Sequence, residues 1–222
     1  MLTRDAWSAV AGLAHGFLGR TDSEGERWEA IVARLAAPPL ALPRQVHGIR
    51  VAEAAVGVRP EADALVVRRP GLLVGVVTAD CVPVLLVDRR RAVVASVHAG
   101  WRGTAAGVLE AAMEHLRAAF GARPADLEAV IGPAIAGCCY EVGAEVADAF
   151  RARTGDATAP AWTRRGSRRH LDLRIAARRL LEAAGVGSVA VLGPCTVCGP
   201  GYHSYRRDGA RTGRQLSFAG WE

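Results

Sequence analysis

The sequence predicts an α+β fold in which short strands form mixed β-sheets. Apolar runs rich in Val and Leu follow one another in the middle of the chain, helical segments lie among them, and no repeat or linker divides the chain. Consecutive strands with interspersed helices favour this class over strict βαβ alternation. The chain has 222 residues, half of them apolar, which is enough to bury a sizeable core. We therefore expect one domain spanning residues 1–222.

The central strands are predicted from three apolar runs, Leu72–Val77, Val82–Asp88 and Val93–Val97, each bounded by charged or glycine-containing turns. Such runs are typical of strands that are buried on both faces. Another run, Ala62–Val67, precedes them, and Arg68–Gly71 has the composition of a turn. We therefore expect Ala62–Val67 and Leu72–Val77 to form a strand pair.

The clearest helix is predicted for Gly103–Phe120, whose apolar residues form one stripe. Thr104 is its candidate N-cap, and Gly121 is a candidate stop. An earlier helix is predicted for Glu24–Ala37, because its apolar residues have near-helical spacing and two prolines follow it.

The second half of the chain is predicted to add two helices and two strands around a polar loop. Asp172 is a candidate N-cap for the second of these helices. The residues after Cys198 form a polar and aromatic tail in which we predict no element. The expected segments are the strand Leu127–Ile131, a helix over roughly Gly143–Arg153, the loop Thr154–Arg169, a helix from Asp172 to Ala184, and the strand Val189–Leu192.

The charge of the chain suggests an anionic partner. The formal net charge is +6, and every basic residue is Arg. Guanidinium favours bidentate contacts with carboxylate and phosphate, although a compositional bias of the genome would give the same pattern. The arginines lack the interleaved aromatic residues that single-strand binders use. An anionic small molecule is therefore favoured over nucleic acid as a partner.

The expected location is cytoplasmic. No apolar stretch approaches the length of a membrane span, and the first residues lack the features of a signal peptide. Membrane is therefore not an expected partner. Five cysteines, two of them adjacent, argue against a disulfide framework and favour reduced thiols with metal or catalytic roles.

The first candidate site consists of His47, Cys81 and His98, each beside an apolar segment. Two imidazoles and one thiolate suit a borderline-soft ion such as zinc, and three protein ligands would leave a fourth position for water. The three residues are far apart in the sequence, so spacing alone is a weak signal. The alternative is a pair of hydrogen-bonded histidines and a buried, inert thiol.

The other cysteines carry a weaker signal. Cys195 and Cys198 have C-x-x-C spacing, but the sequence pattern offers no second pair that would complete four ligands. Packing at a strand end is therefore the favoured interpretation. Cys138 and Cys139 are expected to face opposite sides of an extended segment, so that one of them could line a pocket.

Several arginines are candidates for anion recognition. Arg102 follows a strand directly and precedes a helix start, where backbone N–H groups and a guanidinium together suit phosphate or carboxylate. Arg206 and Arg207 are further candidates. For Arg211 and Arg214 a solvated tail is the favoured interpretation.

Taken together, the motifs resemble those of the YfiH family, which is also called the laccase-domain or multicopper polyphenol oxidase-like family. The resemblance covers nearly the whole chain. The motifs occur in order as QVHG (Gln45–Gly48), ADALV (Ala62–Val66), TADCVPVLL (Thr78–Leu86), HAGWRG (His98–Gly103), IGPAIAGCCYEV (Ile131–Val142) and SYRRDGARTGRQ (Ser204–Gln215).

The resemblance implies a layered αββα fold and a zinc site. His47, Cys81 and His98 match the family's zinc ligands, and such a site would also take copper in vitro. The implied reactions are phosphorolysis of adenosine, inosine, guanosine and methylthioadenosine, and deamination of adenosine. A purine nucleoside and phosphate are therefore the expected partners.

The chemistry of these implied reactions suggests roles for single residues. Cys81, His98 and Asp80 are the expected catalytic residues, with Asp80 either a proton shuttle or a buried structural carboxylate. The expected substrate contacts are Arg20, Arg44, Gln45, Arg102 and Cys139, of which the arginines would hold phosphate.

Two other functions compete with this interpretation. One is a cysteine hydrolase, with Cys81 as nucleophile and His98 as base, that acts on an amide such as a peptidoglycan precursor. The other is a non-enzymatic protein that binds a metal or a nucleotide. Laccase activity is disfavoured, because reduction of dioxygen needs further coppers held by many histidines and the chain has six.

Overall fold

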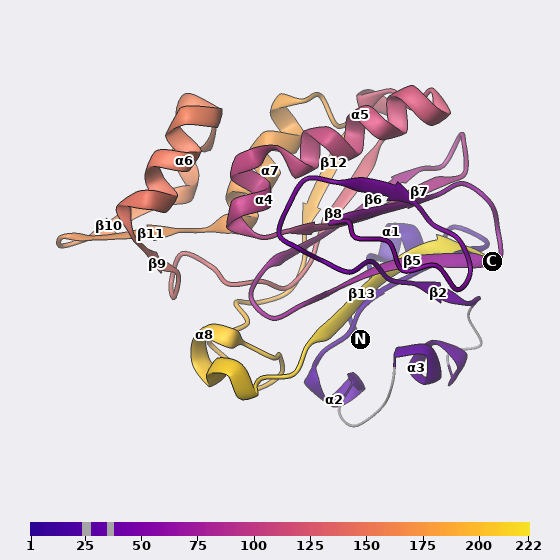
Figure 1. Cartoon of the computed structure of the whole chain (residues 1–222), viewed down its shortest axis with the longest axis horizontal. Helices are drawn as coiled ribbons and strands as arrows, with labels where there is room; N and C mark the ends of the chain where they lie inside the picture. The colour runs from indigo at the N-terminus through magenta and orange to yellow at the C-terminus, as the bar shows by residue number, and fades with distance from the viewer. Residues whose placement is uncertain (24–27, 35–37) are drawn as a thin grey trace.

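A computed structural model describes residues 1–23, 28–34 and 38–222. Figure 1 shows a layered molecule in which two sheets pack face to face between helices. This arrangement confirms the α+β class and the layered order of helix, sheet, sheet and helix. One outer layer contains α4 (Trp101–Ala106), α5 (Val108–Phe120) and α7 (Leu173–Ala183), and the other contains α2 (Arg20–Ser23) and α3 (Trp28–Arg34).

The larger sheet has six strands in the order β12-β8-β6-β7-β4-β3. Its central pairs are antiparallel, and the two outermost pairs are parallel, so the sheet is mixed. The strands are β12 (Ser188–Val191), β8 (Glu128–Ile131), β6 (Val82–Asp88), β7 (Val93–Ala99), β4 (Ala64–Val67) and β3 (Val51–Glu53).

The second sheet has four strands in the order β1-β13-β5-β2. They are β1 (Leu13–Phe17), β13 (Gln215–Trp221), β5 (Leu72–Thr78) and β2 (Leu40–Ala41). The polar tail therefore ends in a buried strand that the sequence analysis missed. The sequence of β13, QLSFAGW, alternates small and large side chains and therefore contains no continuous apolar run. In the structure one face of β13 packs on the other sheet, and the other face packs on Leu18 and Ile31.

The cores on the two faces of the six-stranded sheet follow from the two-residue period of a strand. In β6, Val84 and Leu86 pack toward the helices, whereas Leu85 and Val87 pack between the sheets. Every residue of β6 and β7 is buried. This confirms the prediction of central strands covered on both faces.

The sequence analysis expected Ala62–Val67 and Leu72–Val77 to form a strand pair. This prediction is wrong, because the two segments lie in different sheets. β4 pairs with β7 in the larger sheet, and β5 pairs with β13 in the smaller one. The intervening turn crosses from one sheet to the other. Leu65 and Val67 then meet Leu72 and Val74 across the space between the sheets, so side-chain packing replaces the expected backbone pairing.

The predicted helix Gly103–Phe120 is two helices. Gly107 adopts a left-handed conformation, with φ of 103°, and separates α4 from α5. The first helix begins two residues earlier than predicted, with Gly100 at its N-cap, and Thr104 is buried inside it. Gly121 ends α5 in the left-handed conformation, as predicted. Part of the helix predicted for Glu24–Ala37 lies outside the described residues, and the described part forms α3.

The predicted loop Thr154–Arg169 contains a 3-10 helix, Gly155–Ala161, and most of a hairpin between β10 (Trp162–Arg165) and β11 (Arg168–Leu171). Arginine-rich strands lack an apolar run, which is why sequence pattern missed this exposed hairpin. It extends to one side in Figure 1 together with β9 (Glu141–Val142) and α6 (Ala144–Thr154). Asp172 caps α7 as predicted, because its side chain accepts hydrogen bonds from two N–H groups in the first turn.

The remaining helices are short: α1 (Asp5–Ser8), α8 (Tyr205–Asp208) and the 3-10 turns Pro124–Asp126 and Gly209–Arg211. Among the described residues, no helix combines the length and apolar character needed to cross a bilayer.

Candidate active site and metal centre

The structure brings His47, Cys81 and His98 together at one end of the sheets. Cys81 lies in the tight connection between β5 and β6, and His98 lies near the end of β7. The Cys81 Sγ is 3.9 Å from His47 Nε2, and the two imidazole centroids are 4.8 Å apart. One donor atom from each residue lies within 4.8 Å of the others.

Asp63, a fully buried residue just before β4, holds the two histidines in place. Its Oδ1 lies 2.8 Å from His98 Nδ1 and accepts a hydrogen bond of 2.9 Å from the His47 backbone N–H. Its Oδ2 accepts a hydrogen bond of 2.7 Å from Gly48 N–H. The backbone N–H of His98 in turn donates to the backbone carbonyl of Asp63 at 2.7 Å. Asp63 therefore leaves Nε2 as the ring nitrogen of His98 that is available to a ligand.

The loop that carries His47 is strained. His47 has φ of 62°, in the left-handed region that non-glycine residues rarely adopt. Asp80, in the connection between β5 and β6, has a similar strain, with φ of 85°. Gln45 fastens the His47 loop to β5, because its amide donates to Val77 O at 2.8 Å and accepts from Val77 N–H at 2.9 Å. Strain of this kind is found where the surrounding structure fixes a functional side chain.

The three donors fit a zinc ion. Zinc bonds of about 2.0–2.1 Å to nitrogen and 2.3 Å to sulfur place such donors roughly 3.6 Å apart in a tetrahedral site. The distance of 3.9 Å between Cys81 Sγ and His47 Nε2 is close to that value. His98, with its other nitrogen on a buried carboxylate, has the arrangement usual for metal-bound histidines. The same donors would accept copper, so the geometry alone does not select the metal.

The electrostatics of the cluster favour a thiolate. Burial raises the pKa of the Cys81 thiol, but hydrogen bonds from His47 and His98 outweigh it and bring the pKa from 9.0 to about 6. Burial lowers the pKa of His98, yet its contacts with Asp63 and Cys81 raise it to about 9. Without a metal, Cys81 and His98 would therefore form an ion pair at neutral pH.

Asp80 has a structural position next to this cluster. Its carboxylate accepts a hydrogen bond of 2.6 Å from Thr196 Oγ1 and one of 2.7 Å from Arg206 N–H. One carboxylate oxygen thus binds the loop that precedes α8, and the other binds α8 itself. Of the two roles considered for Asp80, these contacts support the structural carboxylate rather than the proton shuttle.

A cavity of about 610 Å³ opens above the three donors. Aromatic and cationic side chains dominate its walls. Arg102 stacks on the Trp101 ring at 4.3 Å, and Arg206 lies over Tyr140 at 5.1 Å. Burial raises the pKa of Tyr140 to about 12, so its phenol keeps its proton at neutral pH. The cationic lining residues are Arg44, Arg59, Arg102, Arg206 and Arg214.

The expected substrate contacts divide into two groups. Arg44, Gln45 and Arg102 line the cavity, although Arg44 is paired with Glu61 and the Gln45 amide is used by Val77. Arg20 and Cys139 are not among the described residues that line it. Arg20 instead pairs with Asp208 at 2.8 Å, and Cys139 lies in a cluster of cysteines.

The sequence analysis missed Asp63 as a site residue. A carboxylate inside the apolar segment ADALV was the available signal, because a buried aspartate must be hydrogen-bonded. Tyr140 and Tyr205 were also missed. They reach the cavity from a turn and from a four-residue helix, neither of which has a periodic pattern.

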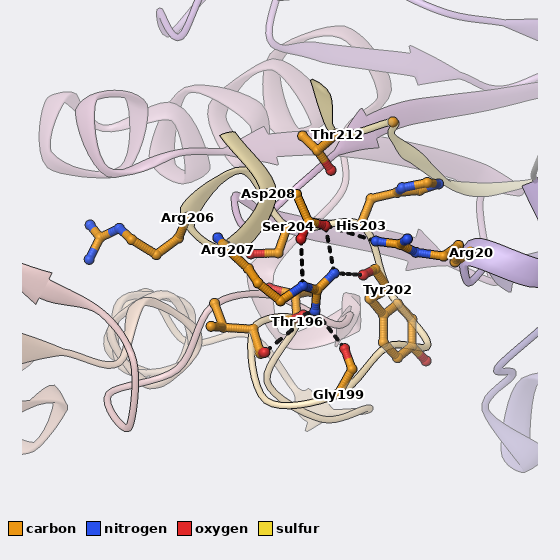
Figure 2. Close-up of polar contacts among 12 residues, drawn as sticks. Arg20, Thr196, Gly199, Tyr202, His203, Ser204, Arg206, Arg207, Asp208 and Thr212 are labelled. Atoms are coloured by element: carbon orange, nitrogen blue, oxygen red, sulfur yellow. Dashed lines mark hydrogen bonds and ion pairs between the residues drawn. The ribbon is translucent and has the colours of Figure 1, made fainter. Parts of the chain in front are cut away.

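The wall of the cavity near α8 is held by Arg207. Figure 2 shows its guanidinium between the carbonyl groups of Thr196, Gly199 and Tyr202 and the carboxylate of Asp208. Arg206 points away from this network in the same view; its guanidinium donates to Glu141 O at 3.1 Å and 3.2 Å, and the residue lines the cavity. Adjacent arginines therefore have different roles: Arg207 builds the loop, and Arg206 lines the cavity.

The four remaining cysteines lie together, contrary to the sequence analysis. Cys138 and Cys139 occupy a turn rather than an extended segment, so both thiols point to the same side and approach Cys198. Cys138 and Cys139 are therefore the second pair of thiols beside Cys195 and Cys198, which the sequence analysis did not find. Burial raises the pKa of the Cys139 thiol to about 11, which argues against Cys139 as a nucleophile.

Comparisons with known proteins agree with the fold. The family described as multi-copper polyphenol oxidoreductase laccase matches residues 23–222. A purine nucleoside phosphorylase of Deinococcus radiodurans is 43% identical over 186 residues, covering 83% of this chain and 71% of that protein. An adenosine deaminase of an unknown prokaryotic organism is 39% identical over 204 residues, covering 80% and 73%.

Solved structures have the same architecture. A Neisseria meningitidis protein superposes with a TM-score of 0.83 at 36% identity, covering all of this chain and 98% of that one. The YfiH protein of Bacillus licheniformis superposes with a TM-score of 0.84 at 29% identity, covering 95% and 93%.

The role of Asp63 leads to a first prediction. Asp63→Asn removes the charge that fixes His98 Nδ1, so zinc affinity should fall by about 10- to 100-fold. The free energy of unfolding should fall by about 1–3 kcal/mol, because a buried acceptor is replaced by a poorly matched amide. Competition with a chromogenic chelator and urea unfolding measure the two effects.

Asp88→Asn is the matched control, since Asp88 is also fully buried and accepts hydrogen bonds from two backbone N–H groups far from the site. It should lower stability and leave zinc affinity unchanged. Equal zinc affinities for wild type and Asp63→Asn would contradict the assignment.

The second prediction concerns pH. In zinc-free protein, alkylation of Cys81 by iodoacetamide should rise with pH around a midpoint near 6, because the folded protein depresses the pKa of this thiol. Peptide-resolved mass spectrometry separates Cys81 from the other cysteines. His98→Ala should move the midpoint upward, toward 9. A wild-type midpoint near that of a free thiol would refute the ion pair.

Proposed function

The chain belongs to the multi-copper polyphenol oxidoreductase laccase family, to which the YfiH proteins belong, and from this we propose that it is a zinc-dependent enzyme of purine nucleosides. The proposed reactions are phosphorolysis of adenosine, inosine, guanosine and methylthioadenosine, and deamination of adenosine. One observation carries the proposal: the cluster of His47, Cys81 and His98 lies at the base of a cavity with aromatic and cationic walls. Relatives named purine nucleoside phosphorylase and adenosine deaminase support it.

His47, Cys81 and His98 would hold the zinc ion. Zinc bound there supplies a Lewis acid that polarises the substrate and lowers the pKa of water toward about 7. The protein contributes the orientation of these ligands through Asp63. It also contributes the strained loop at His47, which aims the imidazole at the cluster.

Aromatic side chains are the proposed contacts for the purine. Trp101 and Tyr140 are half-buried in the cavity wall, and Tyr205 is exposed at its edge. Such rings stack on nucleobases with little dependence on the base. The Tyr140 hydroxyl, which stays protonated at neutral pH, could donate a hydrogen bond to a purine nitrogen or to O6.

Phosphate is assigned to the cationic side of the cavity. We propose Arg102 as its main contact, assisted by Arg206 and Arg214. Arg102 is exposed, is held in place by stacking on Trp101, and lies in the first turn of α4. Guanidinium matches two phosphate oxygens at once, and neighbouring positive charge would raise the local concentration of the anion.

The ligands in the described part of the chain do not suit a multicopper oxidase. Histidine occurs in one of the two groups there that could hold a metal ion, and that group has two histidines and one cysteine. Reduction of dioxygen needs further coppers held by additional histidines. The family description therefore does not transfer its chemistry to this chain.

A second candidate function rests on a different property of the same residues. Asp63, His98 and Cys81 form a chain of contacts like that of a cysteine hydrolase, with a depressed thiol pKa. Such an enzyme would cleave an amide, as in a peptidoglycan precursor. Because zinc would occupy the thiolate, metal dependence separates the two functions.

The third prediction tests the proposed function directly. Protein purified without added metal, with its zinc content measured, should release free base from inosine and adenosine only when phosphate is present. Chelation should abolish this release, and added zinc should restore it. His47→Ala should lose both the zinc of this site and turnover, because it removes one of three ligands.

Chromatography of the products distinguishes phosphorolysis from deamination, which would convert adenosine to inosine without phosphate. Activity that survives chelation, or that appears only on amide substrates, would reject the nucleoside function in favour of the cysteine hydrolase.

The fourth prediction concerns phosphate. Arg102→Ala should raise the KM for phosphate by about 10- to 100-fold, because a hydrogen bond to a charged group contributes about 1.5–3 kcal/mol. The KM for inosine should change much less. Arg117→Ala is the control, since Arg117 pairs with Glu114 on the surface of α5. If both KM values rise together in Arg102→Ala, the residue supports the cavity wall instead.

A further inference from the structure

Four cysteines from two distant segments form a second cluster. The Cys138 and Cys139 sulfur atoms lie 3.4 Å and 3.5 Å from the Cys198 sulfur, and all four sulfur atoms, including that of Cys195, lie within 4.8 Å of one another. None of the four is a ligand in the site described above. We propose that this cluster is a structural zinc site that fastens one wall of the active-site cavity.

Backbone hydrogen bonds in two turns hold the four thiols close together. Cys139 N–H and Tyr140 N–H both donate to Ala136 O at 2.9 Å, which forms a tight turn. Cys198 N–H donates to Cys195 O at 3.3 Å, which closes the turn of the C-x-x-C segment. Cys195 and Cys198 have the spacing usual for structural zinc ligands, and the turn at Cys138 and Cys139 brings the adjacent pair to the same point.

The two turns are fixed to each other. Ala134 and Cys195 form an isolated bridge, and Thr196 N–H donates to Ala134 O at 3.2 Å. Ala136 N–H points at the Cys195 sulfur at 3.4 Å. A backbone N–H directed at a sulfur atom stabilises a thiolate there, as it does around metal-bound cysteines.

The distances between the sulfur atoms fit one zinc ion better than they fit a disulfide or an iron–sulfur cluster. Zinc–sulfur bonds of about 2.3 Å place the sulfur atoms of a tetrahedral site roughly 3.8 Å apart, near the separations observed. A disulfide needs about 2.05 Å, and Cys198 is almost equally far from two partners, so the arrangement favours no single pair. Thiolates around an iron–sulfur cluster must stand farther apart to enclose several atoms.

Arginines around the cluster would offset its charge. Four thiolates with one zinc ion carry a net charge of −2. Arg165 donates to Cys138 O at 3.1 Å, and Arg206 approaches Cys139 O at 3.5 Å. Arg207 donates to Thr196 O, between the two cysteines of the C-x-x-C segment, at 3.0 Å (Figure 2). Three guanidinium groups therefore contact backbone carbonyls of the two cysteine segments.

The position of the cluster explains what such an ion would stabilise. Tyr140 follows Cys139 directly and lines the cavity, and the segment after Cys198 leads to Tyr205 and Arg206 on the same wall. Asp80, beside Cys81, binds both Thr196 and the Arg206 backbone. Since four protein ligands leave no open position, the ion would hold this wall and take no part in chemistry.

The experiment is a metal count on variants that separate the two sites. The wild-type chain should bind two zinc ions, and the double variant His47→Ala/His98→Ala should keep one. Cys138→Ser/Cys198→Ser should also keep one. Val197→Ala, which alters the same turn without removing a ligand, should keep two. Circular dichroism verifies that each variant is folded.

Cobalt gives a readout that needs no cysteine substitution. Co²⁺ added to the metal-free His47→Ala/His98→Ala variant should produce the intense thiolate charge-transfer and visible bands of a tetrahedral four-sulfur site, at one ion per chain. Zinc should displace it and should raise the Tm of this variant.

Three results would overturn the proposal. One is a folded His47→Ala/His98→Ala variant that binds neither zinc nor cobalt. Another is zinc content in the double cysteine variant equal to that of wild type. The third is freshly purified, non-reduced protein whose mass is two hydrogens lower because of a disulfide among these cysteines. None of these results bears on the zinc of His47, Cys81 and His98, so the proposed function is tested separately.

Discussion

The contact between the Asp63 carboxylate and the His98 imidazole is the constraint on which the site depends. A fully buried carboxylate is stable only when its oxygens are well satisfied, and here one imidazole and the N–H groups of the His47 loop satisfy them. The same contacts that keep Asp63 charged therefore fix the His98 imidazole and the backbone of the His47 loop. The same side chain therefore contributes to the stability of the fold and to the geometry of the candidate metal site.

The two-sheet architecture provides the rigid frame for that contact. The site takes Cys81 from the connection between the two sheets and His98 from β7, and both strands beside that connection are covered on each face. Such close packing leaves little freedom to move a donor atom by an ångström. The cavity wall near α8 is instead built from turns and short helices, which pack on a small apolar cluster of Ile135, Ala136 and Cys195. That wall is where Arg207 and the four cysteines add cross-links.

Some arginines near the cavity hold the protein's own backbone and carboxylates, whereas others are exposed to the cavity. Arg207 and Arg20 bind groups of the protein itself, whereas Arg102 stacks on Trp101 in the cavity wall. Asp80 likewise accepts hydrogen bonds from Thr196 and from the Arg206 backbone in α8. A net positive charge, read from composition alone, therefore overstates the number of groups available to an anion.

The sequence by itself determined the α+β class, the buried central strands and the capped helix at Asp172, because each of these has a local signal such as an apolar run or a capping side chain. Its motifs also singled out His47, Cys81 and His98 as candidates. Only the tertiary structure decided that Ala62–Val67 and Leu72–Val77 lie in different sheets, that Asp63 organises the histidines, and that Cys138 and Cys139 face Cys195 and Cys198. These facts depend on which segments meet across long stretches of chain. Side-chain periodicity records which face of a strand is buried, but it does not record the partner that covers it.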